Sequence, residues 1–159
     1  MGAMLALAAA ALFGALGVAT RKRAVRLADE SEERLPVGTD GIIVGAQPIE
    51  LVAAHASAPG HGLSPSPRDN PAVLVLHGGG DTPQTLRYLA AYLHARGYAV
   101  EVPLLSGHGR TVREFASVHA EDWIAEARTK FRALRQKHDW VALVGLSMGG
   151  ALAARVAAE

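Results

Sequence analysis

From residue 72 onward, apolar positions form short continuous runs that are separated by longer mixed stretches. Each run has the length of a strand, and runs without polar interruption are typical of strands buried on both faces of a sheet. Glycine or proline follows closely on each of them. We therefore predict three strands, at residues 72–76, 98–102 and 140–144.

The stretches between these runs have helical spacing. Apolar residues recur at i, i+3, i+4 and i+7 between Thr82-Pro83, a helix start, and Gly97, a helix stop. A second helix is predicted from near Ala120 to Lys137, and an alanine-rich helix from the glycines after residue 147 to Glu159. Because strands and helices alternate, we expect an α/β fold with a mostly parallel sheet and helices on both faces.

In a sheet of this kind, ligands bind at the carboxyl ends of the strands. Two glycine-bearing turns, beginning at His77 and at Gly145, follow predicted strands directly. We expect both turns at the same edge, where a functional site would lie.

The first half of the chain is less regular. Residues 41–54 are rich in Ile, Val and Ala, and Pro48 interrupts them, which predicts two short strands. Residues 56–71 contain four prolines and predict a surface loop. No internal repeat is evident.

The first 20 residues carry no charged side chain, and a basic group follows them at once: Arg21, Lys22, Arg23 and Arg26. Twenty helical residues span roughly 30 Å, the thickness of a bilayer core. Basic residues after the span predict a membrane anchor with the rest of the chain in the cytoplasm. The alternatives are a cleaved export signal and a soluble alanine-rich helix. The predicted parts are the anchor (1–20), a basic collar and charged stalk (21–39) and the globular part (40–159).

Composition excludes several classes of protein. A chain of 159 residues, half of them apolar, suits one domain, and 16 basic against 15 acidic residues argues against a nucleic-acid binder. Without cysteine there is no disulfide, thiolate metal site or thiol nucleophile. Neither a phosphate-binding loop, a dinucleotide motif nor a paired-histidine metal pattern occurs, so we expect no cofactor and no metal. Nothing predicts the oligomeric state.

The segment Gly145-x-Ser147-x-Gly149 matches the nucleophile elbow pattern G-x-S-x-G. In an elbow the serine stands on a tight strand-to-helix turn, and glycine is needed two residues to either side because side chains there would collide with backbone. The following helix directs its N-terminal amides towards the site. The alternative is a glycine-rich turn with an incidental serine. The position between an apolar run and a helix-forming stretch favours the elbow.

Four segments occur in this order along the chain: Leu76-His77-Gly78-Gly79, Leu105-Ser106-Gly107-His108-Gly109, Glu121-Asp122-Trp123 and Gly145-Leu146-Ser147-Met148-Gly149-Gly150. With these segments, residues 73–158 resemble the first half of an α/β hydrolase, most closely the branch of carboxylesterases, monoacylglycerol lipases and S33-type serine hydrolases. The resemblance implies a partial α/β-hydrolase fold behind the N-terminal apolar helix.

The resemblance implies a role for each site residue. Ser147 is the expected nucleophile, and the backbone N–H groups of Gly79 and Met148 are the expected oxyanion donors. His77 and His108 are expected to hold their loops rather than act as bases. Gly78, Gly145 and Gly149 are the supporting glycines.

In α/β hydrolases an acid and then a histidine follow the nucleophile in the chain. After Ser147 there is one acid, Glu159, and all seven histidines precede the serine. Two explanations stay open: a fragment of a longer hydrolase, or a short chain that works without the full triad. Loss of the base lowers kcat by roughly 10⁶. We therefore expect negligible hydrolysis of p-nitrophenyl butyrate by these 159 residues alone.

Three functional hypotheses follow. The first is a serine ester hydrolase that works through an acyl-enzyme on a small-molecule ester. If residues 1–20 anchor the protein at a membrane, a lipid ester such as a monoacylglycerol becomes the favoured substrate. The second is a non-catalytic remnant or interaction module that retains the fold. The third is peptide hydrolysis or acyl transfer on the same scaffold.

Overall fold

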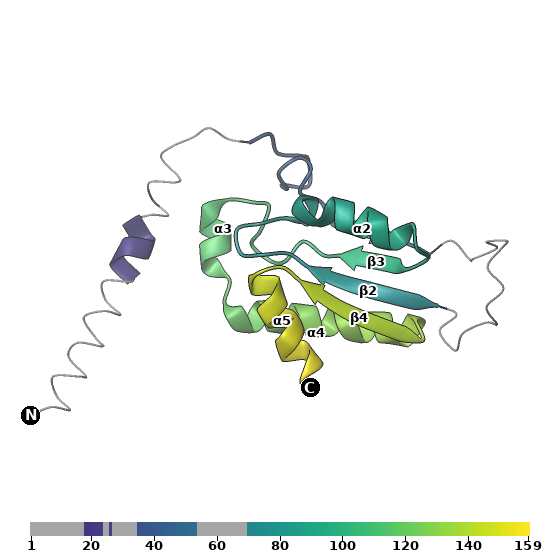
Figure 1. Ribbon diagram of the computed structural model, residues 1–159. Helices are drawn as coiled ribbons and strands as arrows, with labels where there is room; N and C mark the ends of the chain where they lie inside the picture. Colours follow the sequence, from purple (N-terminus) through teal and green to yellow (C-terminus); the bar gives the residue numbers. More distant parts are fainter. Residues whose placement is uncertain (1–17, 24–25, 27–34, 54–69) are drawn as a thin grey trace, which may run out of the picture.

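One four-stranded sheet forms the centre of the protein in the computed structural model, which describes residues 18–23, 26, 35–53 and 70–159 (Figure 1). The order across the sheet is β1-β3-β2-β4. The strands are β1 (Ile49–Leu51), β2 (Pro71–Leu76), β3 (Ala99–Val102) and β4 (Trp140–Gly145).

The sheet is mixed, so the prediction of a mostly parallel sheet is wrong. β2 pairs in parallel with β3 and with β4, whereas β1 pairs with β3 in the antiparallel direction. The three strands of the regular second half are joined by crossover helices, which enforce parallel pairing. β1 is an edge strand that no such helix joins to β3, so this constraint does not apply to it.

Two helical layers cover the sheet. Side chains alternate along β2: Leu74 and Leu76 pack with α4 and α5, whereas Val73 and Val75 pack with η1 and α2. In Figure 1, α2 lies on one side of the sheet and α4 and α5 lie on the other. The helices are η1 (Pro83–Leu86), α2 (Arg87–His94), α3 (Val112–Ser117), α4 (Ala120–Lys137) and α5 (Met148–Ala157).

Most predicted elements of the second half are present. The helix predicted from near Ala120 to Lys137 is α4, with the same bounds. The helix predicted after Thr82 is divided into η1 and α2. In place of the two strands predicted at residues 41–54, residues 41–53 contain one strand, β1, and Ile43 forms an isolated bridge with Val37.

The short helix α3 was not predicted. It begins at a capping box in which the Thr111 hydroxyl accepts from the N–H of Glu114 and the Glu114 carboxylate accepts from the N–H of Thr111. The signal, threonine followed three residues later by glutamate, is visible in the sequence.

The predicted apolar helix lies mostly outside the described residues, which begin at residue 18. Helical residues are described at 18–23 and 26. Among the helices of the described ranges, none combines the length and the apolar character needed to cross a bilayer. The location of the protein stays a prediction.

Candidate functional site

Ser147 lies on a strained turn between β4 and α5. Its φ of 52° and ψ of −117° make it the one non-glycine residue with positive φ in the described part of the chain. The residue is exposed, and although it occupies the N-cap position of α5, its hydroxyl makes no capping hydrogen bond. The turn therefore presents the hydroxyl outward at an energetic cost that the surrounding structure must offset.

The two glycines of the motif are required by direct backbone contact. A β-carbon on Gly145 would lie 2.2 Å from the carbonyl carbon of Gly149. A β-carbon on Gly149 would lie 2.1 Å from the carbonyl oxygen of Leu76. Neither obstacle is a side chain that could rotate away, so the elbow closes only with glycine at both positions.

The elbow packs against the turn that follows β2. The N–H of Leu146 donates to the carbonyl of Leu76 at 3.0 Å. The position of a β-carbon on Gly78 is 3.5 Å from the Ser147 β-carbon, and that of Gly79 is 3.5 Å from the Met148 sulfur. The two turns predicted to share one edge of the sheet thus lie side by side.

The first turn of α5 supplies positive electrostatic potential beside Ser147. The N–H groups of Gly150 and Ala151 both donate to the Ser147 carbonyl, at 2.9 and 3.2 Å. The N–H of Met148 is the first of the helix, and the first N–H groups of a helix have no acceptor within it. A developing negative charge in front of this terminus would be stabilised by the helix dipole.

His77 is fully buried and uses both ring nitrogens to hold loops. Its Nε2 accepts from the N–H of Leu105 at 3.1 Å, so its Nδ1 carries the proton and donates to the carbonyl of Gly78 at 2.9 Å. Burial is the main cause that lowers the pKa of His77 below its ordinary value. A neutral imidazole with both nitrogens engaged cannot accept the proton of Ser147.

His108 is part of the loop after β3, and its ring lies in an aromatic cluster. Its Nδ1 donates to the carbonyls of Leu105 and Ser106, each at 3.2 Å. The ring centroid is 4.8 Å from those of His77 and Phe115 and 5.4 Å from that of Trp123. Its Nε2 is buried and has no hydrogen-bond partner among the described residues. Hydrogen bonds and ring contacts together fix the loop.

No role is assigned from the sequence to several residues around the site, namely Asp81, Trp123 and Glu126. The Asp81 carboxylate accepts from the Thr85 hydroxyl at 2.5 Å, and its other oxygen is 3.3 Å from the β-carbon position of Gly78. Trp123 donates through Nε1 to the carbonyl of Ser106, and the Glu126 carboxylate accepts from the N–H and the hydroxyl of Ser106. Asp81 and Thr85 are only four residues apart, whereas no local pattern marks the partners of Ser106, which are 17 and 20 residues away. No cluster of potential metal ligands is found within the described ranges.

Comparisons with known proteins identify the family to which the chain belongs. Residues 67–159 match the Hydrolase_4 family, described as "Serine aminopeptidase, S33". This match covers more than half of the chain, which therefore belongs to that family.

The chain is similar to two curated relatives. It is 36% identical over 80 residues to a thermostable monoacylglycerol lipase of Bacillus sp. (strain H-257), and this alignment covers 50% of the chain and 32% of the relative. It is 35% identical over 80 residues to a carboxylesterase of Bacillus subtilis (strain 168), with the same coverage of 50% and 32%. The chain thus spans about a third of the length of these relatives.

A solved structure from work on LipS and LipT, two metagenome-derived lipolytic enzymes, is also similar. The TM-score is 0.58 and the identity 36%, over 70% of this chain and 40% of that one. Sequence and structure therefore both place the chain in a family of hydrolases, and the relatives reported above are named as a lipase, an esterase and lipolytic enzymes.

Proposed function

We propose that this protein is a serine ester hydrolase in which Ser147 attacks the carbonyl carbon of a carboxylic ester. The observation that carries the proposal is the geometry of Ser147, an exposed hydroxyl on a positive-φ turn at the start of a helix. A serine does not occupy such a conformation for packing, because its side chain is outside the core. The relatives named as a lipase and an esterase support an ester as the substrate.

In the proposed acylation step, a bond forms between Oγ of Ser147 and the carbonyl carbon, and the π electrons move to the carbonyl oxygen. The N–H groups of Met148 and Gly79 donate to this oxyanion, since the turns that carry them are in contact. Collapse of the intermediate expels the alcohol and leaves an acyl-enzyme, which water then hydrolyses.

The hydroxyl proton must pass to a base and then to the leaving alcohol. His77 is not suited to accept it, because its Nδ1 donates to the Gly78 carbonyl and its Nε2 is engaged by Leu105. His108 is not suited either, because its Nε2 is buried and makes no hydrogen bond with Ser147 or with any other described residue. The proposal is therefore made for the gene product that contains these 159 residues, and not for residues 70–159 acting alone.

A fluorophosphonate probe tests the proposal, because it forms a covalent bond with an activated serine. We expect labelling of the purified gene product at Ser147, identified by mass spectrometry of the tryptic peptide, together with hydrolysis of p-nitrophenyl butyrate. Ser147→Ala should abolish both, whereas Ser106→Ala, a serine in a neighbouring loop whose hydroxyl binds Glu126, should retain labelling.

Labelling that survives in Ser147→Ala would place the nucleophile elsewhere. If the wild-type protein is neither labelled nor active, the fold is present without the chemistry, and the protein is not an enzyme of this kind.

A further inference from the structure

A cavity of about 600 Å³ lies between the helical residues 18–23 and the short helix α3. Four of the side chains that line it are positively charged: Arg21, Lys22, Arg26 and Arg113. No acidic side chain belongs to the part of its lining that lies in the described ranges. The volume is typical of small-molecule sites, which measure about 300–1,000 Å³. The charge of the lining favours an anion as the occupant.

Helical spacing directs the charged side chains of both walls to the cavity. Val18, Arg21 and Lys22 are spaced i, i+3 and i+4, so they share one face of their helix. The three lining residues of α3 have the same spacing, and Arg113 is the first of them. Two helix faces that are remote in sequence therefore meet at one cavity.

A hydrogen bond joins the two walls. Nη2 of Arg21 donates to the carbonyl of Ala116, in the last turn of α3, where carbonyl groups have no partner within a helix. This bond uses one of the five N–H groups of the guanidinium, so Arg21 can hold the wall and also donate to an anion. The bond keeps the charge of Arg21 at the cavity.

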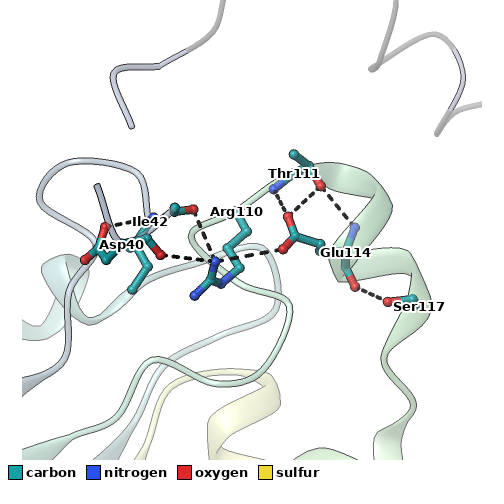
Figure 2. A network of polar contacts seen from close by, with 7 residues as sticks. Asp40, Ile42, Arg110, Thr111, Glu114 and Ser117 are labelled. Atoms are coloured by element: carbon teal, nitrogen blue, oxygen red, sulfur yellow. Dashed lines mark hydrogen bonds and ion pairs between the residues drawn. The ribbon is translucent and has the colours of Figure 1, made fainter. Parts of the chain in front are cut away.

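Figure 2 shows what fixes the wall formed by α3. The Thr111 hydroxyl accepts from the N–H of Glu114, and the Ser117 hydroxyl donates to the Glu114 carbonyl at 2.7 Å. The Glu114 carboxylate is the one acidic group of α3, and it accepts from Thr111 and lies 3.9 Å from Nη1 of Arg110. Glu114 does not line this cavity. The helix therefore presents Arg113 to the cavity and holds its carboxylate elsewhere.

We propose that this cavity binds a phosphate monoester, with the phosphate group held by the basic side chains of both walls. A phosphate monoester has a charge of about −1.5 to −2 at pH 7, which several cations stabilise better than they stabilise a singly charged carboxylate. The planar guanidinium also matches two phosphate oxygens at once. Val18 and Ala116 add apolar surface, which suits the organic part of an ester. No residue of the Ser147 turn lines the cavity, so the site is independent of the proposed function.

The same phosphate chemistry occurs in soluble esters and in the head group of phosphatidic acid. Calorimetry of the gene product with sn-glycerol 3-phosphate tests the first source. Sedimentation with phosphatidylcholine vesicles, prepared with and without phosphatidic acid, tests the second. Binding of the soluble ester assigns a soluble ligand, and binding of phosphatidic acid vesicles alone assigns a lipid head group. Either result supports the site, and binding of neither probe overturns it.

Lys22→Gln and Arg23→Gln form a matched pair of variants. The two residues are exposed neighbours in one helix, and each exchange removes one positive charge, but only Lys22 lines the cavity. Loss of a charged hydrogen bond should weaken binding roughly tenfold in Lys22→Gln. Arg23→Gln should change the affinity less than about twofold, because salt screens an exposed charge outside the site. Equal losses in both variants would mean that the overall charge of this segment attracts the phosphate, and would overturn the site.

Arg113→Gln tests the wall formed by α3, and Arg135→Gln, at an exposed residue of α4 outside the lining, is its control. We expect Arg113→Gln to weaken binding roughly tenfold, whereas Arg135→Gln and Ser147→Ala should bind as the wild type does. Urea unfolding of each variant shows whether the fold is retained. Wild-type affinity in Arg113→Gln would remove α3 from the site and contradict the proposal.

Discussion

The elbow at Gly145–Gly149 and the turn at His77–Gly80 follow neighbouring strands at one edge of the sheet, and both are rich in glycine. The reasons for glycine differ. In the elbow, a β-carbon on Gly149 would lie 2.1 Å from the backbone oxygen of Leu76. In the other turn, a β-carbon on Gly79 would meet the Met148 sulfur at 3.5 Å, and one on Gly80 would meet nothing within 4 Å.

This difference shows two physical origins for one sequence signal. Glycine in the elbow allows two backbone segments to touch. Because the obstacles to a β-carbon are backbone atoms, no rotation of a side chain could make room for another residue. Gly80 has open space but a φ of +72°, so its requirement is conformational. Substitution by alanine should separate the two origins, because a steric conflict with backbone costs more than a left-handed conformation.

Gly149→Ala should have the largest effect. The added methyl group would overlap the carbonyls of Leu76 and His77, at 2.1 and 2.6 Å, so the start of α5 must move away from β2. Overpacking usually costs about 1–3 kcal/mol, and we expect at least the upper value because backbone must shift. Urea unfolding of the purified protein measures the change.

Gly150→Ala is the matched control for this prediction. It adds the same methyl group to the next residue, where the nearest atom is the Gly145 oxygen at 3.3 Å, and alanine favours the helix. We expect a change in the free energy of unfolding within about 1 kcal/mol. If the two variants are equally stable, backbone contact is not what requires Gly149.

His77→Leu should have the next largest effect and probes the turn after β2. The variant leaves the N–H of Leu105 without its acceptor in the core. An unsatisfied buried donor costs about 1–3 kcal/mol, and we expect a loss of about 2 kcal/mol in the free energy of unfolding at pH 8. His138→Leu is the comparison. It removes a half-buried ring that is hydrogen-bonded to Asn70 and lies away from this turn, so its cost in the free energy of unfolding should be smaller.

The pH dependence of His77→Leu tests whether the imidazole is buried in its neutral form. The pKa of folded His77 lies below 6.5 because of burial, so just below pH 6.5 the unfolded chain binds a proton that the folded protein does not. The free energy of unfolding of the wild type should therefore fall as the pH drops below 6.5, down to the folded pKa. The contribution of His77 to this slope should be absent from the variant, and identical slopes would contradict the burial of a neutral imidazole.

Gly80→Ala should cost about 1 kcal/mol, because no atom obstructs the methyl group and only the left-handed conformation is unfavourable. Asparagine tolerates this conformation better than alanine does, so Gly80→Asn should cost less. Urea unfolding of the two variants measures the difference. Equal costs would mean that an unrecognised contact, and not φ, selects glycine here.

The regular second half of the fold was predictable because its signals are local. The bounds of α4 follow from apolar spacing between Ala120 and Lys137, and β2 and β4 from continuous apolar runs. The capping box of α3 at Thr111 and Glu114 is an equally local signal. The direction of β1 was not predictable, because a strand without a crossover helix can pair either way.

The site was predictable in outline only. Topology alone places the turns at His77 and Gly145 at one edge of a parallel sheet, and the structure brings them into contact. Which glycine touches backbone and which faces open space depends on distances between segments remote in sequence. For the same reason, the hydrogen bonds from Arg110 to the carbonyls of Asp40 and Gly41 leave no signal in any short pattern.

Gly79→Ala should have the smallest effect of the series. Gly79 does not have a positive φ, and its β-carbon would be in ordinary van der Waals contact with the Met148 sulfur at 3.5 Å. Alanine restricts the unfolded chain, which stabilises a protein by about 0.4–1 kcal/mol where the conformation is compatible. We expect a gain of about 0.5 kcal/mol in urea unfolding and ester hydrolysis within threefold of wild type, because the backbone N–H remains. A loss of hydrolysis greater than tenfold at unchanged stability would show that the substrate itself needs the space beside Gly79.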